Sequence, residues 1–214
     1  MNDQSLEAIA TAAQPEANLL TPTLGAPFAG GHYGGRVRVG EAILAIAWAP
    51  KALGETRLPW MPRPCFVLGC GSLGDSTANT RALAAVGSPL GAWAGALRIA
   101  GHADWVVPAR DVLELAYRHF KPTRTDNFAD GIDGTNGTSV PGGGAYARKF
   151  PQVTQAAAFA PGGPEAFEET WYWSSTQYAE AHAKGQGFDT GEQLDCGKKY
   201  PGLVRAVRLV RLNR

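Results

Sequence analysis

The sequence predicts an α+β fold built from short helices, antiparallel strands and one long loop region. Strand-like and helix-like segments occupy separate parts of the chain, and 27 glycines and 15 prolines keep the regular elements short. Regular pattern almost vanishes between residues 122 and 170. The 214 residues suffice for one large domain with its own core, and two full domains are not expected.

The first thirty residues differ from the rest and are predicted to form an arm. Ala, Gln, Thr and Pro are frequent there, and only one narrow stripe of a short helix could form, from Leu6, Ile9, Ala10 and Ala13. Such a segment cannot bury enough apolar surface alone, so we expect it to be disordered or to be ordered by a neighbouring subunit. The chain is therefore divided into an arm, residues 1–30, and a domain, residues 31–214.

A β-hairpin is predicted at the start of the domain. Residues 35–39 and 42–49 are strand-like, and Gly40 and Glu41 form the turn between them. The stretch 58–64 contains three prolines, which exclude a central strand or a helix. It is predicted to be a connection.

Two short helices are predicted after this connection. The first covers residues 76–86, because Asp75 or Ser76 can accept from the free amides at its start and Gly87 gives a left-handed stop. The second starts at Pro89, where a serine cap precedes a proline whose missing amide costs nothing.

A third helix is predicted to begin at Pro108. The apolar side chains that recur there at helical spacing are Ala109, Val112, Leu113, Ala116 and Phe120. Arg110, Glu114 and Arg118 fall on the other face and are predicted to point outward.

The segment between residues 122 and 170 is the longest irregular part of the chain. Gly, Pro, Asn, Asp and Thr dominate it, and a turn of helix near residues 153–159 is the exception. A stretch of this length is typical of a functional loop region or of disorder. Strands return after it and are predicted at residues 171–174, 185–189, 192–196 and 203–212.

Side chains of this segment are the candidates for ligand binding, because loops on a rigid scaffold carry function. They are predicted to lie in exposed loops and are Asp126, Asn127, Asp130, Asp133, Asn136 and Tyr146. The oxygen atoms of Asp126, Asp130, Asp133 and Asn136 could hold calcium, but the one-three-five spacing of the usual calcium loop is absent. Turn-forming Asp and Asn residues explain the same pattern, so no metal is expected.

Three aromatic residues open the first late strand. Trp171, Tyr172 and Trp173 could stack on a sugar, but alternation along a strand places the two tryptophans on one face, which favours core packing. Ser174 and Ser175 follow without a glycine-flanked elbow. They are interpreted as hydrogen-bonding residues of the strand end and not as nucleophiles.

Composition and charge exclude several classes of function. A formal net charge of +1 gives no field that would gather nucleic acid. The longest apolar run, residues 42–50, is too short to cross a bilayer, and the N-terminus lacks the pattern of a signal peptide. We therefore expect a protein made in the cytoplasm and either kept there or carried outside in an assembly.

Metal, disulfide and phosphate sites are not expected either. Cys65, Cys70 and Cys196 are an odd number without CxxC spacing, and the four histidines are scattered. Arg205 and Arg208 are spaced by three in the last strand, so they point to different faces and suit ion pairs at a strand edge. No cofactor is expected.

Taken in order, several of these segments resemble the Lcl C-terminal-domain family of C-type-lectin-like folds, over about residues 30–212. The residues that carry the resemblance are Asp104, Trp105, Pro108, Trp171, Trp173, Ser174, Ser175, Arg205 and Arg208. The resemblance implies a C-type-lectin-like fold in which the chain ends meet in one sheet and the loops are displayed on one side. Chains of this kind are frequent among bacteriophage proteins of unknown function.

The resemblance also implies a role in a virion. We expect a component of a tail tip, baseplate or fibre whose loop face contacts a host surface receptor, assembled in the host cytoplasm as part of a symmetric oligomer. The arm would dock onto other virion proteins. The alternative is a purely architectural subunit, such as a tail adaptor or a capsid decoration.

An enzyme is not expected. The formylglycine-generating oxidases share the architecture but need a paired-cysteine copper site, whereas Cys65 and Cys70 lie in a proline-rich connection. The chain also has neither a Glu-Pro-Asn nor a Trp-Asn-Asp triplet, the signatures of calcium-dependent sugar binding in C-type lectins.

Overall fold

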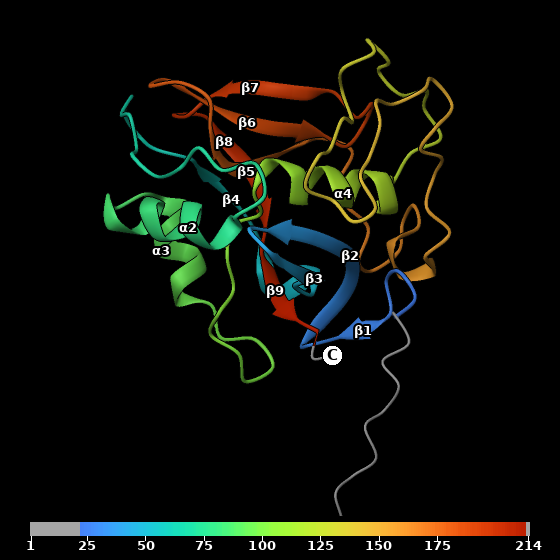
Figure 1. The fold of residues 1–214 in the computed structure, drawn as a ribbon, viewed down its shortest axis with the longest axis horizontal. Coiled ribbons are helices and arrows are strands. Elements are labelled where there is room, and N and C mark those ends of the chain that lie inside the picture. The colour runs from blue at the N-terminus through green and yellow to red at the C-terminus, as the bar shows by residue number, and fades with distance from the viewer. Residues whose placement is uncertain (1–21, 213–214) are drawn as a thin grey trace, which may run out of the picture.

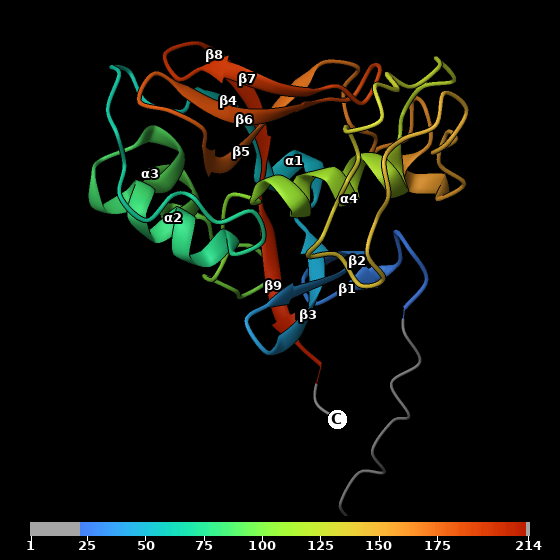
Figure 2. The same ribbon diagram turned by 45° about the horizontal axis from the view of Figure 1, so that its top comes forward.

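Two curled, mainly antiparallel sheets and a few short helices form the protein in the computed structural model, which describes residues 22–212 (Figure 1). This confirms the predicted α+β class. Helices α2 (Ser76–Ala85) and α3 (Pro89–Ala96) lie on one side of the molecule, and the irregular segment 122–170 lies on the other. Helix α4 (Arg110–Phe120) runs between the two sheets (Figure 2).

The first sheet joins strands from both ends of the described chain. Its order is β1 (Pro27–Phe28), β2 (Gly31–Val39), β3 (Ala42–Trp48) and β9 (Val207–Arg211). The predicted hairpin is confirmed, and Gly40 in its turn has a φ of 56°, a conformation that glycine adopts without strain. Strand β9 pairs with β3, so the chain ends meet in one sheet as expected.

The second sheet is formed mostly by the late strands. Its order is β4 (Glu55–Pro59), β8 (Pro201–Arg205), β5 (Trp171–Gln177), β6 (His182–Gly187) and β7 (Gln193–Gly197). Part of the predicted connection 58–64 is the end of β4, and its proline is tolerated because β4 is an edge strand. The predicted hairpin of β6 and β7 is confirmed with shifted ends.

The continuous strand predicted at residues 203–212 is wrong. The chain leaves the second sheet after β8 and enters the first at β9, with Ala206 at the corner. Ala206 N donates to Gly54 O, and Ala206 O accepts from Ala49 N. These bonds bend the chain between the sheets, and no local sequence pattern marks the bend.

The predicted boundary between arm and domain also needs correction. Residues 1–21 of the predicted arm lie outside the described residues. Residues 22–30 include β1, which pairs with β2 through Pro27 and Phe28. The folded domain therefore begins before residue 31.

The ends of α2 and the start of α3 lie within one residue of where they were predicted, whereas α4 begins at Arg110, two residues after the predicted start at Pro108. Asp75 Oδ1 accepts from Ala78 N at the start of α2, and Gly87 after its end has a φ of 72°. Helix α3 begins at Pro89 as predicted, but the Ser88 side chain does not cap it, because its Oγ donates to Trp60 O instead. The short helices α1 (Lys51–Gly54) and η1 (Ala157–Phe159) complete the set, and the latter falls within the helical turn predicted near residues 153–159.

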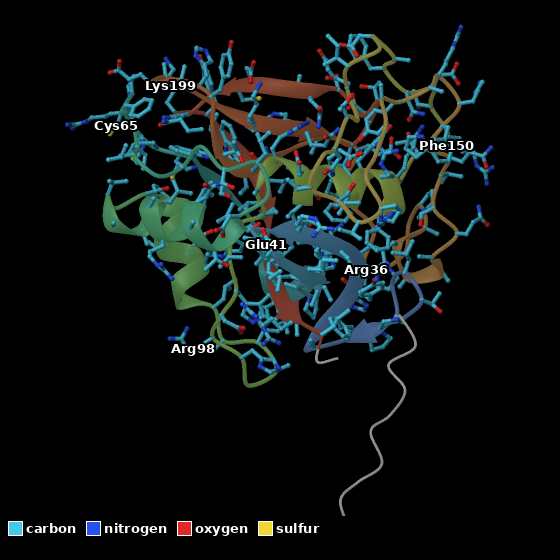
Figure 3. The ribbon with its side chains drawn as sticks, in the orientation of Figure 1. Arg36, Glu41, Cys65, Arg98, Phe150 and Lys199 are labelled. Atoms are coloured by element: carbon cyan, nitrogen blue, oxygen red, sulfur yellow. The ribbon has the colours of Figure 1, made fainter. Side chains whose placement is uncertain are left out.

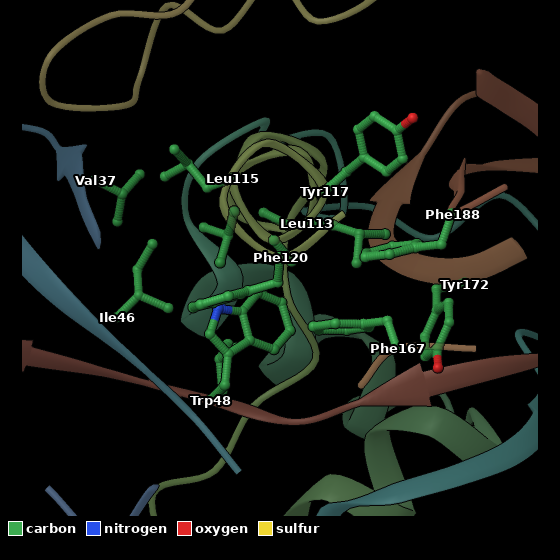
Figure 4. Packing of buried hydrophobic residues seen from close by; sticks show 14 of the residues in the cluster. Val37, Ile46, Trp48, Leu113, Leu115, Tyr117, Phe120, Phe167, Tyr172 and Phe188 are labelled. Atoms are coloured by element: carbon green, nitrogen blue, oxygen red, sulfur yellow. The ribbon is translucent and has the colours of Figure 1, made fainter. Parts of the chain in front are cut away.

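The larger core lies around α4 (Figure 4). Val37 and Ile46 reach it from the first sheet, and Tyr172 comes from the second. Aromatic rings stack through it, with ring centroids 4.0 Å apart for Phe120 and Phe159 and 4.4 Å apart for Phe167 and Phe188. The apolar face predicted for the third helix is therefore confirmed.

A second core lies on the other face of the second sheet, under α2 and α3. It is formed by Trp60, Leu83, Leu90 and Trp173 with their neighbours. Tyr172 belongs to the first core and Trp173 to the second, so the predicted alternation along this strand is confirmed.

Candidate functional site

The irregular segment 122–170 is held against α4 by buried polar side chains. Glu114 was predicted to point outward, and that prediction is wrong, because Glu114 is fully buried. The segment folds over the face of α4 that would otherwise meet solvent. The sequence pattern of a helix cannot show that a distant loop covers its polar face.

Glu114 is the centre of this arrangement. Its Oε1 accepts from Tyr146 Oη at 2.9 Å and from Arg118 Nε at 2.8 Å, and its Oε2 accepts from Asn136 Nδ2 at 2.6 Å. Burial raises the pKa of Glu114, and the charge of Arg118 with the hydrogen bonds opposes that rise. One carboxyl group thus anchors two separate parts of the segment.

Arg118 extends the same anchor to the backbone. Its Nη2 donates to Gly134 O at 2.6 Å and to Gly144 O at 2.9 Å. Gly134 lies so close to the Tyr146 ring that a Cβ would stand 2.4 Å from it, and its φ is 90°. Only glycine can place its backbone this close to the Tyr146 ring.

Asp111, which is also buried, holds the next turn. Its Oδ2 accepts from Thr138 Oγ1 at 2.8 Å, and its backbone oxygen accepts from Asn136 Nδ2 at 2.7 Å. Asn136 Oδ1 accepts from Ser139 N, a local turn bond. Residues 138–140 then bond to the backbone of β2, through Arg38 N to Thr138 O and Val140 N to Arg36 O.

Lys121 organises the part of the segment that follows α4. Its Nζ donates to Thr125 O and to Asn127 Oδ1, and Tyr117 Oη donates to the same Asn127 oxygen at 2.7 Å. Asn127 Nδ2 donates to Ala147 O and Pro151 O at 3.0 Å each. Burial lowers the pKa of Lys121. Asn127 therefore ties the beginning of the segment to residues 147–151.

Most of the candidate binding residues are not exposed, contrary to the prediction. Asn127, Asp133, Asn136 and Tyr146 are buried. Asp133 Oδ2 accepts from Gln193 N of β7, and burial raises its pKa. These residues hold the loops in place from the protein interior, because an irregular backbone needs side-chain partners for its polar groups.

Asp126 and Asp130 remain accessible to solvent. Asp130 Oδ1 accepts from Ile132 N and Asp133 N at 2.8 Å, which confirms the interpretation of this residue as turn-forming. Within residues 22–212, no group of three or more His, Cys, Asp or Glu side chains is arranged to hold a metal ion.

Asp126 lies in a pocket of about 430 Å³ that the sequence analysis did not find. Its carboxylate pairs with Arg148 Nε at 2.6 Å and with Lys149 Nζ. Lys121 and Arg124 also line the pocket, so four cationic side chains face one carboxylate and the local formal charge is +3. Residues 124 and 148 are distant in the sequence, and the backbone bond from Asn127 N to Arg148 O joins their segments.

The residues of the family resemblance serve the fold. Arg208 pairs with Asp104 at 2.6 and 2.9 Å, and its guanidinium lies over the ring of Trp105. Ser175 N donates to Pro108 O. The structure thus brings residues 104–108 beside β5 and β9.

The remaining motif residues are buried or half-buried. Trp171 and Trp173 pack edge to face, with ring centroids 4.7 Å apart, and Ser174 Oγ donates to Lys184 O. Arg205 is fully buried, where the expectation was a strand edge. Its guanidinium pairs with Glu165 and lies over the ring of Phe167, so it is compensated in the interior.

The three cysteines are free thiols. Cys70 is buried, its Sγ donates to Asn79 O, and burial raises its pKa to about 11.

No helix in residues 22–212 is long and apolar enough to span a membrane. Comparisons with protein-family models, curated proteins and solved structures return no match for this chain.

Proposed function

We propose that the chain is a bacteriophage virion protein, part of a tail tip, baseplate or fibre, that presents a C-type-lectin-like domain to the host surface. The observation that carries the proposal is the long irregular segment 122–170, fixed to a rigid helix by Glu114, Asp111 and Lys121. Loops with a fixed conformation lose little entropy on binding, which suits recognition.

The C-type-lectin-like assignment has two supports. Strands from both ends of the domain lie in one sheet, and the long loop region gathers on one side of the molecule, as this kind of fold requires. The motif residues of the resemblance also contact one another, as in the pair of Asp104 and Arg208.

In this proposal the chain assembles in the host cytoplasm into a symmetric oligomer, and residues 1–21 connect the domain to other virion proteins. Deletion of these residues tests the connection. We expect particles to lose the protein, while the isolated domain keeps its melting temperature, because a segment with only one narrow apolar stripe can bury little surface. Normal incorporation of the shortened protein would refute this role.

Receptor binding is tested with exposed residues of the loop face. Ile132 is 70% exposed and Phe128 is 45% exposed, so Ile132→Ser and Phe128→Ser should leave the fold intact. We expect particles that carry both changes to assemble normally and to adsorb to host cells about 10-fold less, as for loss of a contact residue of an interface. Val86→Ser, at the C-terminal end of α2 on the opposite side of the molecule, is the control.

A second candidate is the purely architectural subunit. Phe66 and Leu68 are 64% and 86% exposed in the connection before α2, and exposed apolar side chains of this size are common at subunit contacts. If Leu68→Ser prevents assembly and the loop variants adsorb normally, this candidate replaces the receptor-binding proposal. We propose no enzymatic role: the formylglycine-generating oxidases need a paired-cysteine copper site, and the Cys70 thiol is buried and bonded to Asn79 O.

A further inference from the structure

We propose that the pocket lined by Lys121, Arg124, Arg148 and Lys149 binds the anionic groups of a host surface polysaccharide. The inference rests on the proposed function and names the ligand class of the same loop face. Its ligand would carry phosphate or carboxylate groups along a chain of sugars.

The first argument is the concentration of positive charge. The pocket has a formal charge of +3, while the whole chain carries only +1. The pocket thus combines four of the 20 Lys and Arg residues of the chain with a single carboxylate. A concave site with charges of one sign raises the local concentration of an oppositely charged ligand.

The second argument is that the backbone below these cations is fixed. Asn127 N donates to Arg148 O, and Lys121 Nζ bonds to Thr125 O and Asn127 Oδ1. Arg124 and Arg148 therefore stand on segments that are bonded to each other. Lys121 is buried at the wall of the pocket and adds its positive charge there.

The third argument is that the exposed cations are available. Arg148 and Lys149 have side chains that are 79% and 80% exposed, and both share the carboxylate of Asp126. Such surface pairs contribute little to stability, so an incoming anion can compete for them. The salt bridges within residues 22–212 leave Arg124 without a carboxylate partner. An arginine fork can bind phosphate or carboxylate through two hydrogen bonds.

The other lining residues favour a saccharide over a nucleic acid. Gln152, Gln155 and Thr125 offer amide and hydroxyl groups for sugar hydroxyls, and Pro151 and Val153 offer apolar surface for a sugar ring. No aromatic ring lines the pocket, so a single strand would find no stacking platform there.

The test is direct binding of the full chain to polymers of known charge. The probes are poly(glycerol phosphate), polygalacturonate, neutral dextran and a single-stranded DNA of mixed sequence. Binding of each probe is measured by calorimetry at low and at high salt. We expect the two anionic polymers, polygalacturonate and poly(glycerol phosphate), to bind and to bind more weakly as salt rises, and dextran not to bind.

The variant Arg124→Gln with Arg148→Gln should weaken binding of the anionic polymers about 10-fold or more, because two charge-assisted contacts are lost. The matched control is Arg63→Gln with Lys199→Gln, which removes the same charge from exposed positions. Lys199 and Phe150, a neighbour of the pocket residues Lys149 and Pro151, lie on opposite sides of the molecule (Figure 3). The control should bind within about 2-fold of the wild type.

Several results would overturn the inference. They are equal weakening in the control, equal binding of dextran, or no binding of either anionic polymer. Tighter binding of DNA than of both polymers would replace the saccharide with a nucleic acid. The proposed function fails separately, when adsorption of particles to cells is indifferent to every loop change while polymer binding to the pocket persists.

Discussion

The two sides of the molecule are held together by different means. On the side of α2 and α3, side chains such as Leu83, Leu90 and Trp173 form an apolar core. On the loop side, the irregular segment is fixed by hydrogen bonds to Glu114 of α4 and to Lys121, the residue that follows α4. Regular elements satisfy their own backbone, whereas irregular backbone needs polar side chains as partners.

The largest effect is expected from the apolar side. Trp173→Ala removes a fully buried indole and its bond from Nε1 to Leu58 O, and should lower the free energy of unfolding by about 4 kcal/mol. Urea unfolding followed by circular dichroism measures this loss. We expect the whole domain to unfold earlier, including the loop segment. A cost below about 1 kcal/mol would mean that this core does not stabilise the domain.

The polar side should respond more locally. Glu114→Ala leaves Arg118 and Asn136 without their shared partner and should cost about 3 kcal/mol. Amide hydrogen exchange should accelerate most between residues 134 and 146, while α2 and α3 change only with global stability. Glu114→Gln keeps an acceptor and should lose less. Uniform acceleration throughout the domain would contradict the distinction between the two sides.

The N-terminal cap of α2 is a polar contact on the apolar side of the molecule, and its loss should have an effect of intermediate size. Asp75 caps α2 through its bond to Ala78 N at 2.9 Å. Asp75→Ala should cost about 1 kcal/mol, and Asp75→Asn should restore most of it. Thermal unfolding of the three proteins compares them. An effect as large as that of Glu114→Ala would show that the cap does more than end a helix.

The smallest effect is a dependence on pH at the edge of the loop side. Burial lowers the pKa of His119 below 6.5, Arg118 adds to this, and the bond to Gly34 O opposes it. The unfolded chain then takes up the proton first as pH falls, so this group costs stability from about pH 6.5 down through its folded pKa. Urea unfolding from pH 7.5 to pH 5 should give a flatter profile for His119→Gln. Identical profiles would remove His119 from this role.

The sequence predicted the elements whose signals are local. The cap at Asp75, the proline at the start of α3 and the period of α4 lie within a few residues of the structure that they determine. The burial of Glu114 was missed because its partner Tyr146 lies far along the chain. The corner at Ala206 was missed for a similar reason, since its bonds go to Ala49 and Gly54.

The candidate site was predictable only in part. The segment was identified from its lack of pattern, and its Asp and Asn residues were identified as turn-forming. Their burial was not predictable, because it depends on which residues the loops cover. The pocket combines Arg124 with Arg148 and Lys149, and an overall charge of +1 conceals such a local excess.

The corner at Ala206 bears on how the protein is made. Strands β8 and β9 come after all the others in the chain, yet β8 lies inside one sheet and β9 completes the other. During synthesis, the second sheet cannot be completed until β8 has left the ribosome, and the first cannot be completed until β9 has left it, so Arg205 and Arg208 cannot pair with Glu165 and Asp104 earlier. Folding must therefore wait for contacts between distant parts of the chain, which is slow. Nascent chains stalled before residue 201 should remain sensitive to protease. Chaperones should bind the chain at that stage, because its apolar surface is not yet buried.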